Sequence, residues 1–149
     1  MNKPQAYAVK TTDDRLIFQF NSVSVEKRIK KVVLYQKYSD FPLIFEMMMG
    51  DMLDDDETID FLVESNNGDR DEVLFTVFQT IAMVLDEYSG SKVLFYGSTQ
   101  TRTRLYQILI AKYFEQANDV YVIKGIRNKT EENFVKNTNY DAFLISLQE

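Results

Sequence analysis

The chain has 149 residues, of which 45% are hydrophobic and 27% charged, a length and composition typical of one globular domain. It contains no cysteine and no histidine, which excludes disulfide frameworks, zinc sites built on thiolate or imidazole, and histidine-based catalytic triads. Its formal net charge of −6 disfavours indiscriminate binding to nucleic acid, although a local basic patch is compatible with it.

No linker, repeat or low-complexity tract divides the sequence, so we expect residues 1–149 to form a single domain. Met1–Lys10 lacks the apolar core of a signal peptide, and no apolar run approaches the ~20 residues of a membrane span. We expect a cytoplasmic location, no membrane association, and no metal or cofactor.

The first half of the chain shows the two-residue alternation typical of β-strands. The predicted strands are Gln5–Lys10, Arg15–Ser22, Lys30–Lys37, Leu43–Met49 and Thr58–Glu64. Tyr38–Asp40 is predicted to turn the chain. The acidic run Asp51–Glu57 lacks the ligand spacing of a calcium-binding EF-hand loop, so we interpret it as a solvated loop.

The second half begins with helical spacing of its apolar residues, which predicts a helix over Arg70–Tyr88. The elements predicted after it are a strand at Lys92–Tyr96, a helix ending near Glu115, a strand at Val120–Ile126, a short helix at Glu131–Val135 and a strand at Tyr140–Leu147. We therefore predict an α+β fold. Its mostly antiparallel sheet would start from the N-terminal meander, carry two main helices on one face, and be completed by the C-terminal strands.

The segment Gly97–Tyr106 places a glycine, hydroxyl groups and arginines where a strand passes into a helix. The start of a helix attracts anions, and a guanidinium group binds phosphate or carboxylate. The candidate anion- or partner-binding residues in this segment are Ser98, Thr99, Arg102, Arg104 and Tyr106. The glycine would permit a ligand to approach the backbone closely. In the alternative interpretation the hydroxyl of Ser98, Thr99 or Thr101 caps the helix, and Arg102 and Arg104 pair with surface carboxylates.

A second polar segment, Ser65–Asp71, leads into the first helix. Asn66, Asn67 and Asp69 are its candidate site residues, and the alternative is an ordinary turn followed by a helix cap. If both helices start at the same edge of the sheet, the two segments would be neighbours and would share one polar cleft.

The sequence resembles a family of small uncharacterised bacterial proteins of about 150 residues. The resemblance rests on Ser65-Asn66-Asn67-Gly68-Asp69 and on Gly97-Ser98-Thr99 followed by Arg102-Thr103-Arg104-Leu105-Tyr106, which match two signature segments of that family. It implies no activity, but it directs attention to these two polar segments.

Three functional hypotheses follow. The favoured one is a non-enzymatic binding or regulatory module with an anionic ligand or a protein partner. The second is a phosphoester-processing, nuclease-like enzyme in which Arg102 and Arg104 stabilise phosphate charge while Asp69 or Tyr106 moves a proton. The third is a single-stranded nucleic-acid-binding protein, which would associate in a salt-dependent manner.

Overall fold

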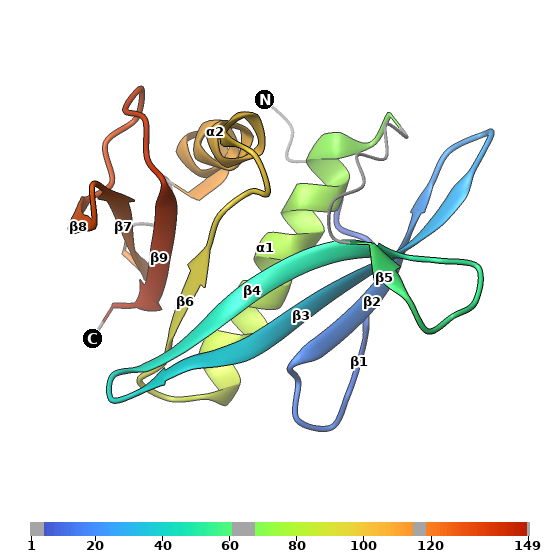
Figure 1. Ribbon diagram of the computed structural model, residues 1–149, viewed down its shortest axis with the longest axis horizontal. Coiled ribbons are helices and arrows are strands. Elements are labelled where there is room, and N and C mark those ends of the chain that lie inside the picture. Colours follow the sequence, from blue (N-terminus) through green and yellow to red (C-terminus); the bar gives the residue numbers. More distant parts are fainter. Residues whose placement is uncertain (1–4, 61–67, 115–118, 149) are drawn as a thin grey trace. The chain divides into compact units, whose positions relative to one another are not determined.

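The computed structural model describes residues 5–60, 68–114 and 119–148. Within them it contains two α-helices and nine strands, which form a mostly antiparallel sheet (Figure 1). The predicted α+β class is confirmed. The chain divides into two compact units, which we call unit 1 (Met1–Gln36 and Met48–Glu87) and unit 2 (Lys37–Met47 and Tyr88–Glu149). That the chain forms a single domain, and that both helices lie on one face of the sheet, stay predictions.

Unit 1 contains a meander of strands with one buried face. Its strands are β1 (Lys10–Thr11), β2 (Ile17–Val23), the first part of β3 (Arg28–Asp40), the last part of β4 (Leu43–Met52) and β5 (Ile59–Asp60). Strands β1, β2 and β3 pair antiparallel in that order, and β5 pairs antiparallel with the end of β4. On β2, Phe18 and Phe20 are buried whereas Ile17 and Asn21 are exposed, which is the alternation of a strand with one covered face.

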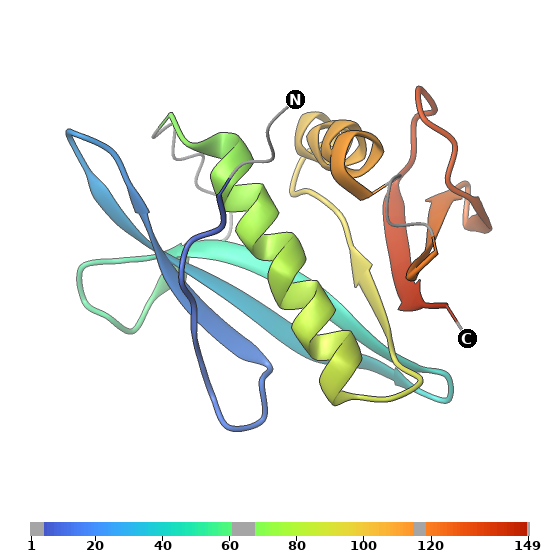
Figure 2. The same ribbon diagram turned by 180° about the vertical axis from the view of Figure 1, so that it is seen from behind.

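Helix α1 (Arg70–Glu87) lies across the strands of unit 1, as Figure 2 shows. Its buried apolar residues recur every three or four positions: Val73, Leu74, Val77, Phe78, Ile81, Val84 and Leu85. Asp71 and Glu72 in its first turn suit the positive end of the helix, and the predicted bounds differ from the observed ones by one residue. No helix among the described residues combines the length and apolar character needed to cross a membrane.

One ion pair of unit 1 is buried. Lys31 Nζ on β3 lies 2.6 Å from Asp51 Oδ1 on β4, and the two side chains are 7% and 10% exposed. The preceding residue, Gly50, is also buried, and a Cβ atom there would lie 2.7 Å from the carbonyl oxygen of Asp60. The pairing of β5 with β4 therefore requires glycine at this position.

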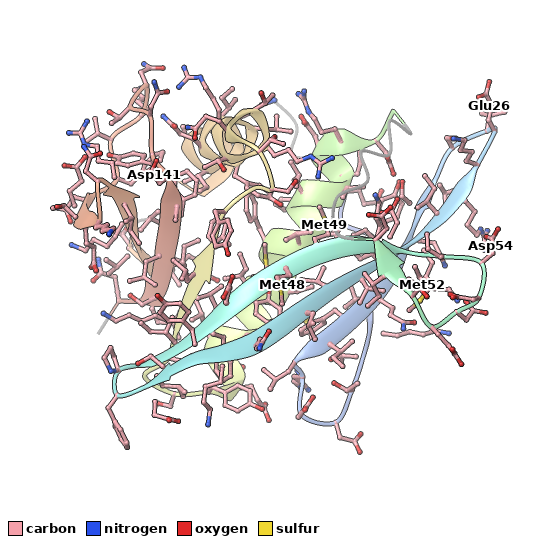
Figure 3. All side chains as sticks on the ribbon, viewed as in Figure 1. Glu26, Met48, Met49, Met52, Asp54 and Asp141 are labelled. Atoms are coloured by element: carbon pink, nitrogen blue, oxygen red, sulfur yellow. The ribbon has the colours of Figure 1, made fainter. Side chains whose placement is uncertain are left out.

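The loop between β4 and β5 is held by the carboxylate of Asp55. Its Oδ1 accepts hydrogen bonds from the amides of Glu57 (3.0 Å) and Thr58 (2.9 Å), and its Oδ2 accepts one from the Thr58 hydroxyl. These bonds, with that from the Thr58 hydroxyl the largest cause, lower the pKa of Asp55 to about 2. Asp54 lies on the outer side of the same loop (Figure 3).

In unit 2 the strand order is β4-β6-β9-β7-β8, with β6 (Lys92–Phe95), β7 (Tyr121–Arg127), β8 (Thr130–Asn133) and β9 (Ala142–Leu147). The β4–β6 pair is parallel and the others are antiparallel. Because β9 is antiparallel to both β6 and β7, these two strands run in the same direction without touching. The strand, helix and strand predicted in this order thus form a split βαβ unit, with β9 between its two strands.

Helix α2 (Gln100–Leu109) connects β6 to β7 and continues as a π-helical turn, η1 (Ile110–Phe114). It packs on β6 through Tyr106, whose ring meets that of Phe95 edge to face at 5.7 Å between centroids. Ile110, four residues after Tyr106, is fully buried, so the packed face continues into η1.

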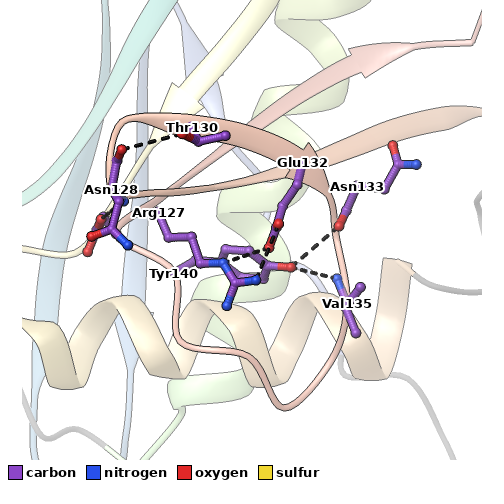
Figure 4. A network of polar contacts seen from close by, with 8 residues as sticks. Arg127, Asn128, Thr130, Glu132, Asn133, Val135 and Tyr140 are labelled. Atoms are coloured by element: carbon purple, nitrogen blue, oxygen red, sulfur yellow. Dashed lines mark hydrogen bonds and ion pairs between the residues drawn. The ribbon is translucent and has the colours of Figure 1, made fainter.

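The ring of Tyr140 lies directly on the backbone of β7. A Cβ atom at Gly125 would overlap the ring carbons of Tyr140, whose side chain is 1% exposed. The Tyr140 hydroxyl accepts a hydrogen bond from the amide of Val135 at 2.9 Å and donates one to the carbonyl of Asn133 at 3.4 Å (Figure 4). Ring and hydroxyl together fix the loop that leads from β8 to β9.

Strands β7 and β8 form a tight hairpin. Asn128 and Lys129 form its turn with φ angles of +51° and +62°, a left-handed pair typical of two-residue hairpin loops. Arg127 Nε lies 2.9 Å from Glu132 Oε1 across the hairpin (Figure 4).

Several predicted boundaries were wrong. Residues 130–133 form β8 where a helix was predicted over Glu131–Val135, because the Asn128-Lys129 turn folds them back onto β7. Of the strand predicted at Gln5–Lys10 only Lys10 is observed, in β1, since the Tyr7 amide donates to the Thr76 hydroxyl of α1 instead of to a neighbouring strand. Tyr38–Asp40 continues β3, and the turn follows at residues 41–42. Of the predicted strand Thr58–Glu64, β5 is observed, and residues 61–64 lie outside the described part.

Candidate functional site

Thr99 is the N-cap of α2. Its hydroxyl accepts a hydrogen bond from the amide of Arg102 at 3.2 Å, and its carbonyl accepts one from the amide of Thr103 at 3.0 Å. The sequence predicted a hydroxyl cap at Ser98, Thr99 or Thr101, and the structure assigns it to Thr99.

The turn before α2 is held against the helix by the buried Thr103. Its hydroxyl accepts from the amide of Gly97 at 3.0 Å and donates to the carbonyl of Thr99 at 3.1 Å. A Cβ atom at Gly97 would lie 2.5 Å from the amide nitrogen of Thr103. Glycine is therefore required here by the close approach of the helix itself, whereas the sequence suggested the approach of a ligand.

Arg102 turns back towards the start of α2, where its Nη1 lies 2.6 Å from the hydroxyl oxygen of Ser98. The first turn of α2 contains no acidic residue, in contrast to that of α1. Among the residues that the structure describes, the amides of Gln100 and Thr101 have no acceptor. The start of α2 thus gathers two amide donors, a hydroxyl and a guanidinium group, which is a suitable arrangement for an anion.

The side chain of Arg104 does not join that of Arg102 at the start of α2. Its Nη1 donates to the side-chain oxygen of Asn139 at 2.7 Å, in the loop between β8 and β9. Two positions along a helix differ by about 200°, so Arg102 and Arg104 cannot close on one small ligand as a pair. Within the described ranges no carboxylate forms an ion pair with Arg104, which is exposed. The predicted pairing of this arginine with a surface carboxylate is therefore not seen there.

Tyr106 belongs to the core of unit 2. Its side chain is buried against Phe95, and this burial raises the pKa of the Tyr106 hydroxyl to about 12, with the positive charge of Arg102 acting weakly in the opposite direction. The raised pKa makes this phenol harder to deprotonate than an exposed tyrosine.

Asp69 joins three segments of unit 1. Its Oδ2 accepts hydrogen bonds from the hydroxyls of Tyr7 (2.5 Å) and Ser22 (2.6 Å), and its carbonyl accepts one from the amide of Val73 in α1 (2.9 Å). The Tyr7 ring stacks on Phe20 at 5.9 Å between centroids. Burial, followed by the hydrogen bond to Asp69, raises the pKa of Tyr7. Asp69 thus fixes the residues before β1 and the strand β2 to the start of α1.

The remaining candidates are placed as follows. Asn66 and Asn67 lie outside the described residues. Asp69 belongs to unit 1, and Ser98, Thr99 and Arg102 to unit 2. The shared polar cleft therefore stays a prediction. Within unit 2 the structure brings Ser98, Thr99 and Arg102 together and separates them from the side chain of Arg104.

Sequence reasoning missed the partners of these residues. Asn139 is 35 positions from Arg104, and Tyr7 and Ser22 are 62 and 47 positions from Asp69, so no local pattern connects them. Thr103 was detectable in principle, because it lies four residues after the cap and its hydroxyl can reach back to the turn.

In the acidic loop, the carboxylate of Asp55 accepts hydrogen bonds from the loop's own backbone amides. In the part of the chain that the structure describes, no three His, Cys, Asp or Glu side chains are grouped as metal ligands would be.

Comparison with known proteins gives one match. Residues 3–148 match the model of a family described as a family of unknown function, DUF6934. No curated protein and no solved structure matches the chain.

Proposed function

The chain belongs to the DUF6934 family of unknown function, and we propose from the geometry of its own residues that it is a non-enzymatic binding module. The ligand we propose is an anionic group, carried by a small molecule or by a protein partner. It would bind at the start of α2.

The observation that carries the proposal is the first turn of α2. The free amides of Gln100 and Thr101 lie next to the Arg102–Ser98 contact, and no acidic residue of that turn neutralises the helix end. A bound anion would be stabilised by the positive end of the helix dipole and by the nearby guanidinium group. Arg104, held by Asn139, would extend the site towards a larger partner.

The enzymatic alternative receives less support. The buried Tyr106 hydroxyl, with its pKa raised to about 12, is a poor proton acceptor. The hydrogen bonds from Tyr7 and Ser22 give Asp69 a role in holding the fold of unit 1. A binding role requires neither residue to transfer a proton.

The test is a titration of ¹⁵N-labelled protein with sodium phosphate and, separately, with sodium acetate at constant ionic strength. We expect phosphate to shift the amide signals of Gln100 and Thr101 in a saturable way. Arg102→Ala should abolish saturation while changing the thermal midpoint by less than about 2 °C, since the half-buried Arg102 lies at the surface end of α2 and such side chains contribute little to stability. Saturation by acetate as well would indicate an acidic protein partner.

The matched control is Arg127→Ala, which removes an equally charged side chain from the same unit. If Arg127→Ala weakens phosphate binding as much as Arg102→Ala does, or if the shifts grow linearly with phosphate, the proposed site is wrong. The predicted cytoplasmic location is part of the same proposal and is tested by fractionating cells that produce the tagged chain.

A further inference from the structure

A β-hairpin projects from unit 1 beside the start of α1 (Figures 1 and 2). It consists of residues 21–30, and we call it the β2–β3 arm. Glu26 lies at its tip (Figure 3). The last strand pair is Val23 with Arg28, preceded by Ser22 with Ile29 and Asn21 with Lys30.

The tip of the arm is held in one shape. The Ser24 amide donates to the carbonyl of Lys27 at 2.8 Å, and the Ser24 hydroxyl oxygen accepts from the amides of Glu26 (3.2 Å) and Lys27 (3.1 Å). This loop leaves the side chain of Val25 fully exposed. Its methyl groups make no contact that stabilises unit 1, so they are available to a partner that binds the tip.

The arm has one inner and one outer face. Ser22 points inward to Asp69 and is buried, whereas its neighbours Asn21 and Val23 point outward. By the strand pairing, Arg28 and Lys30 share the outer face with Asn21 and Val23. The outer face therefore carries two cations, and Lys27 adds a third at the tip.

Positive charge is concentrated in the arm although unit 1 as a whole is acidic. Unit 1 has eight Lys and Arg against fifteen Asp and Glu, a net charge of −7, and three of the eight lie in the arm, with Lys31 directly after it. Lys31 is buried with Asp51, and Lys30 lies 2.9 Å from Asp56 in the acidic loop. Lys27 and Arg28 are exposed and have no ion pair among the described residues.

We propose that the β2–β3 arm binds double-stranded DNA. Lys27 and Arg28 would contact phosphates, and the ribbon would lie in the major groove, which is about 12 Å wide and admits a two-stranded β-ribbon. The exposed methyl groups of Val25 suit contact with thymine methyl groups on the floor of that groove.

The same residues argue against other nucleic acids. Binding of single strands relies on aromatic side chains that stack with bases, and residues 21–30 contain no aromatic residue. The major groove of duplex RNA is too deep and narrow for side chains to read. We therefore expect duplex DNA to bind better than single-stranded DNA or duplex RNA of the same sequence.

The test is fluorescence anisotropy of the full chain with a labelled 20-base-pair DNA duplex at several salt concentrations. We expect the double variant Lys27→Glu/Arg28→Glu to bind at least tenfold more weakly at about 50 mM salt. The slope of log K against log salt should become shallower by about 2, because each phosphate contact contributes about 0.9. Val25→Ser should weaken binding several-fold without changing that slope.

The matched control is Lys129→Glu/Lys136→Glu, which makes the same change of charge at two exposed lysines of unit 2. It should retain most of the affinity. Asp56→Asn should strengthen binding, because it releases Lys30 and removes a negative charge next to the arm. Equal thermal midpoints would show that the arm variants are folded.

The proposal is overturned if the wild-type chain does not bind the duplex at about 50 mM salt, or if the control loses as much affinity as the arm variant. It is also overturned if single strands or duplex RNA bind more tightly than duplex DNA. Tighter, arm-dependent binding to anionic lipid vesicles would assign the arm to a membrane surface instead.

Discussion

Replacing Gly125 by alanine adds one methyl group at the point where the Tyr140 ring lies on β7. The new Cβ atom would overlap the ring carbons. The ring cannot turn away without cost, because its hydroxyl is bonded to Val135 and Asn133 and its edge packs on Phe143 at 5.9 Å between centroids. Overfilling a packed core costs about 1–3 kcal/mol, since side chains or backbone must move.

For a chain of this size, 1 kcal/mol corresponds to about 2–4 °C in the thermal midpoint, so we expect Gly125→Ala to lower it by about 2–12 °C. The assay is thermal unfolding followed by circular dichroism. The control is a double-mutant cycle with Tyr140→Leu, which shortens the side chain. If Gly125→Ala lowers the midpoint equally with tyrosine and with leucine at position 140, ring overlap is not the cause and the reasoning is wrong.

Three further predictions concern the other unit and the helix cap. Lys31→Met should lower the free energy of unfolding by about 3–5 kcal/mol, because it leaves the Asp51 carboxylate buried without its partner. Urea denaturation tests this, and the double variant Lys31→Met/Asp51→Leu should regain most of the lost stability. Thr99→Ala should cost about 1 kcal/mol through loss of the cap, and an unchanged denaturation midpoint would contradict the assignment. The lowered pKa of Asp55 stabilises the fold above its unfolded pKa of about 4, and this contribution disappears as the pH falls through about 2. Asp55→Asn should therefore be less stable than the wild type at pH 6, and the difference should shrink towards pH 2; a difference independent of pH would refute the assignment.

The parts of the fold that the sequence predicted well are those with a local cause. Helix α1 was found because its apolar residues keep one period over five turns and both of its ends carry ordinary helix signals. Strand β8 was missed because Thr130–Asn133 has no strand pattern of its own. It becomes a strand only through the left-handed turn before it and the pairing with β7.

In the candidate site, too, the sequence predicts contacts between neighbouring residues and does not predict contacts between distant ones. The cap at Thr99 depends on residues three positions apart, so the sequence contains enough information to place it. The contact of Arg104 with Asn139, and those of Asp69 with Tyr7 and Ser22, bring together residues from distant parts of the chain. The sequence singled out Arg104 and Asp69, but what each binds depends on tertiary structure.

The position of β9 affects how unit 2 forms while the chain is being made. Ala142–Leu147 is synthesised after β6 and β7, yet it lies between them and supplies the hydrogen bonds of both. At roughly 5–20 residues per second, about 3–11 s separate the synthesis of Lys92 from that of Leu147. During this interval the inner edge of β6, and later also that of β7, has no partner strand, so a chaperone that protects nascent chains would have its longest opportunity to act at β6.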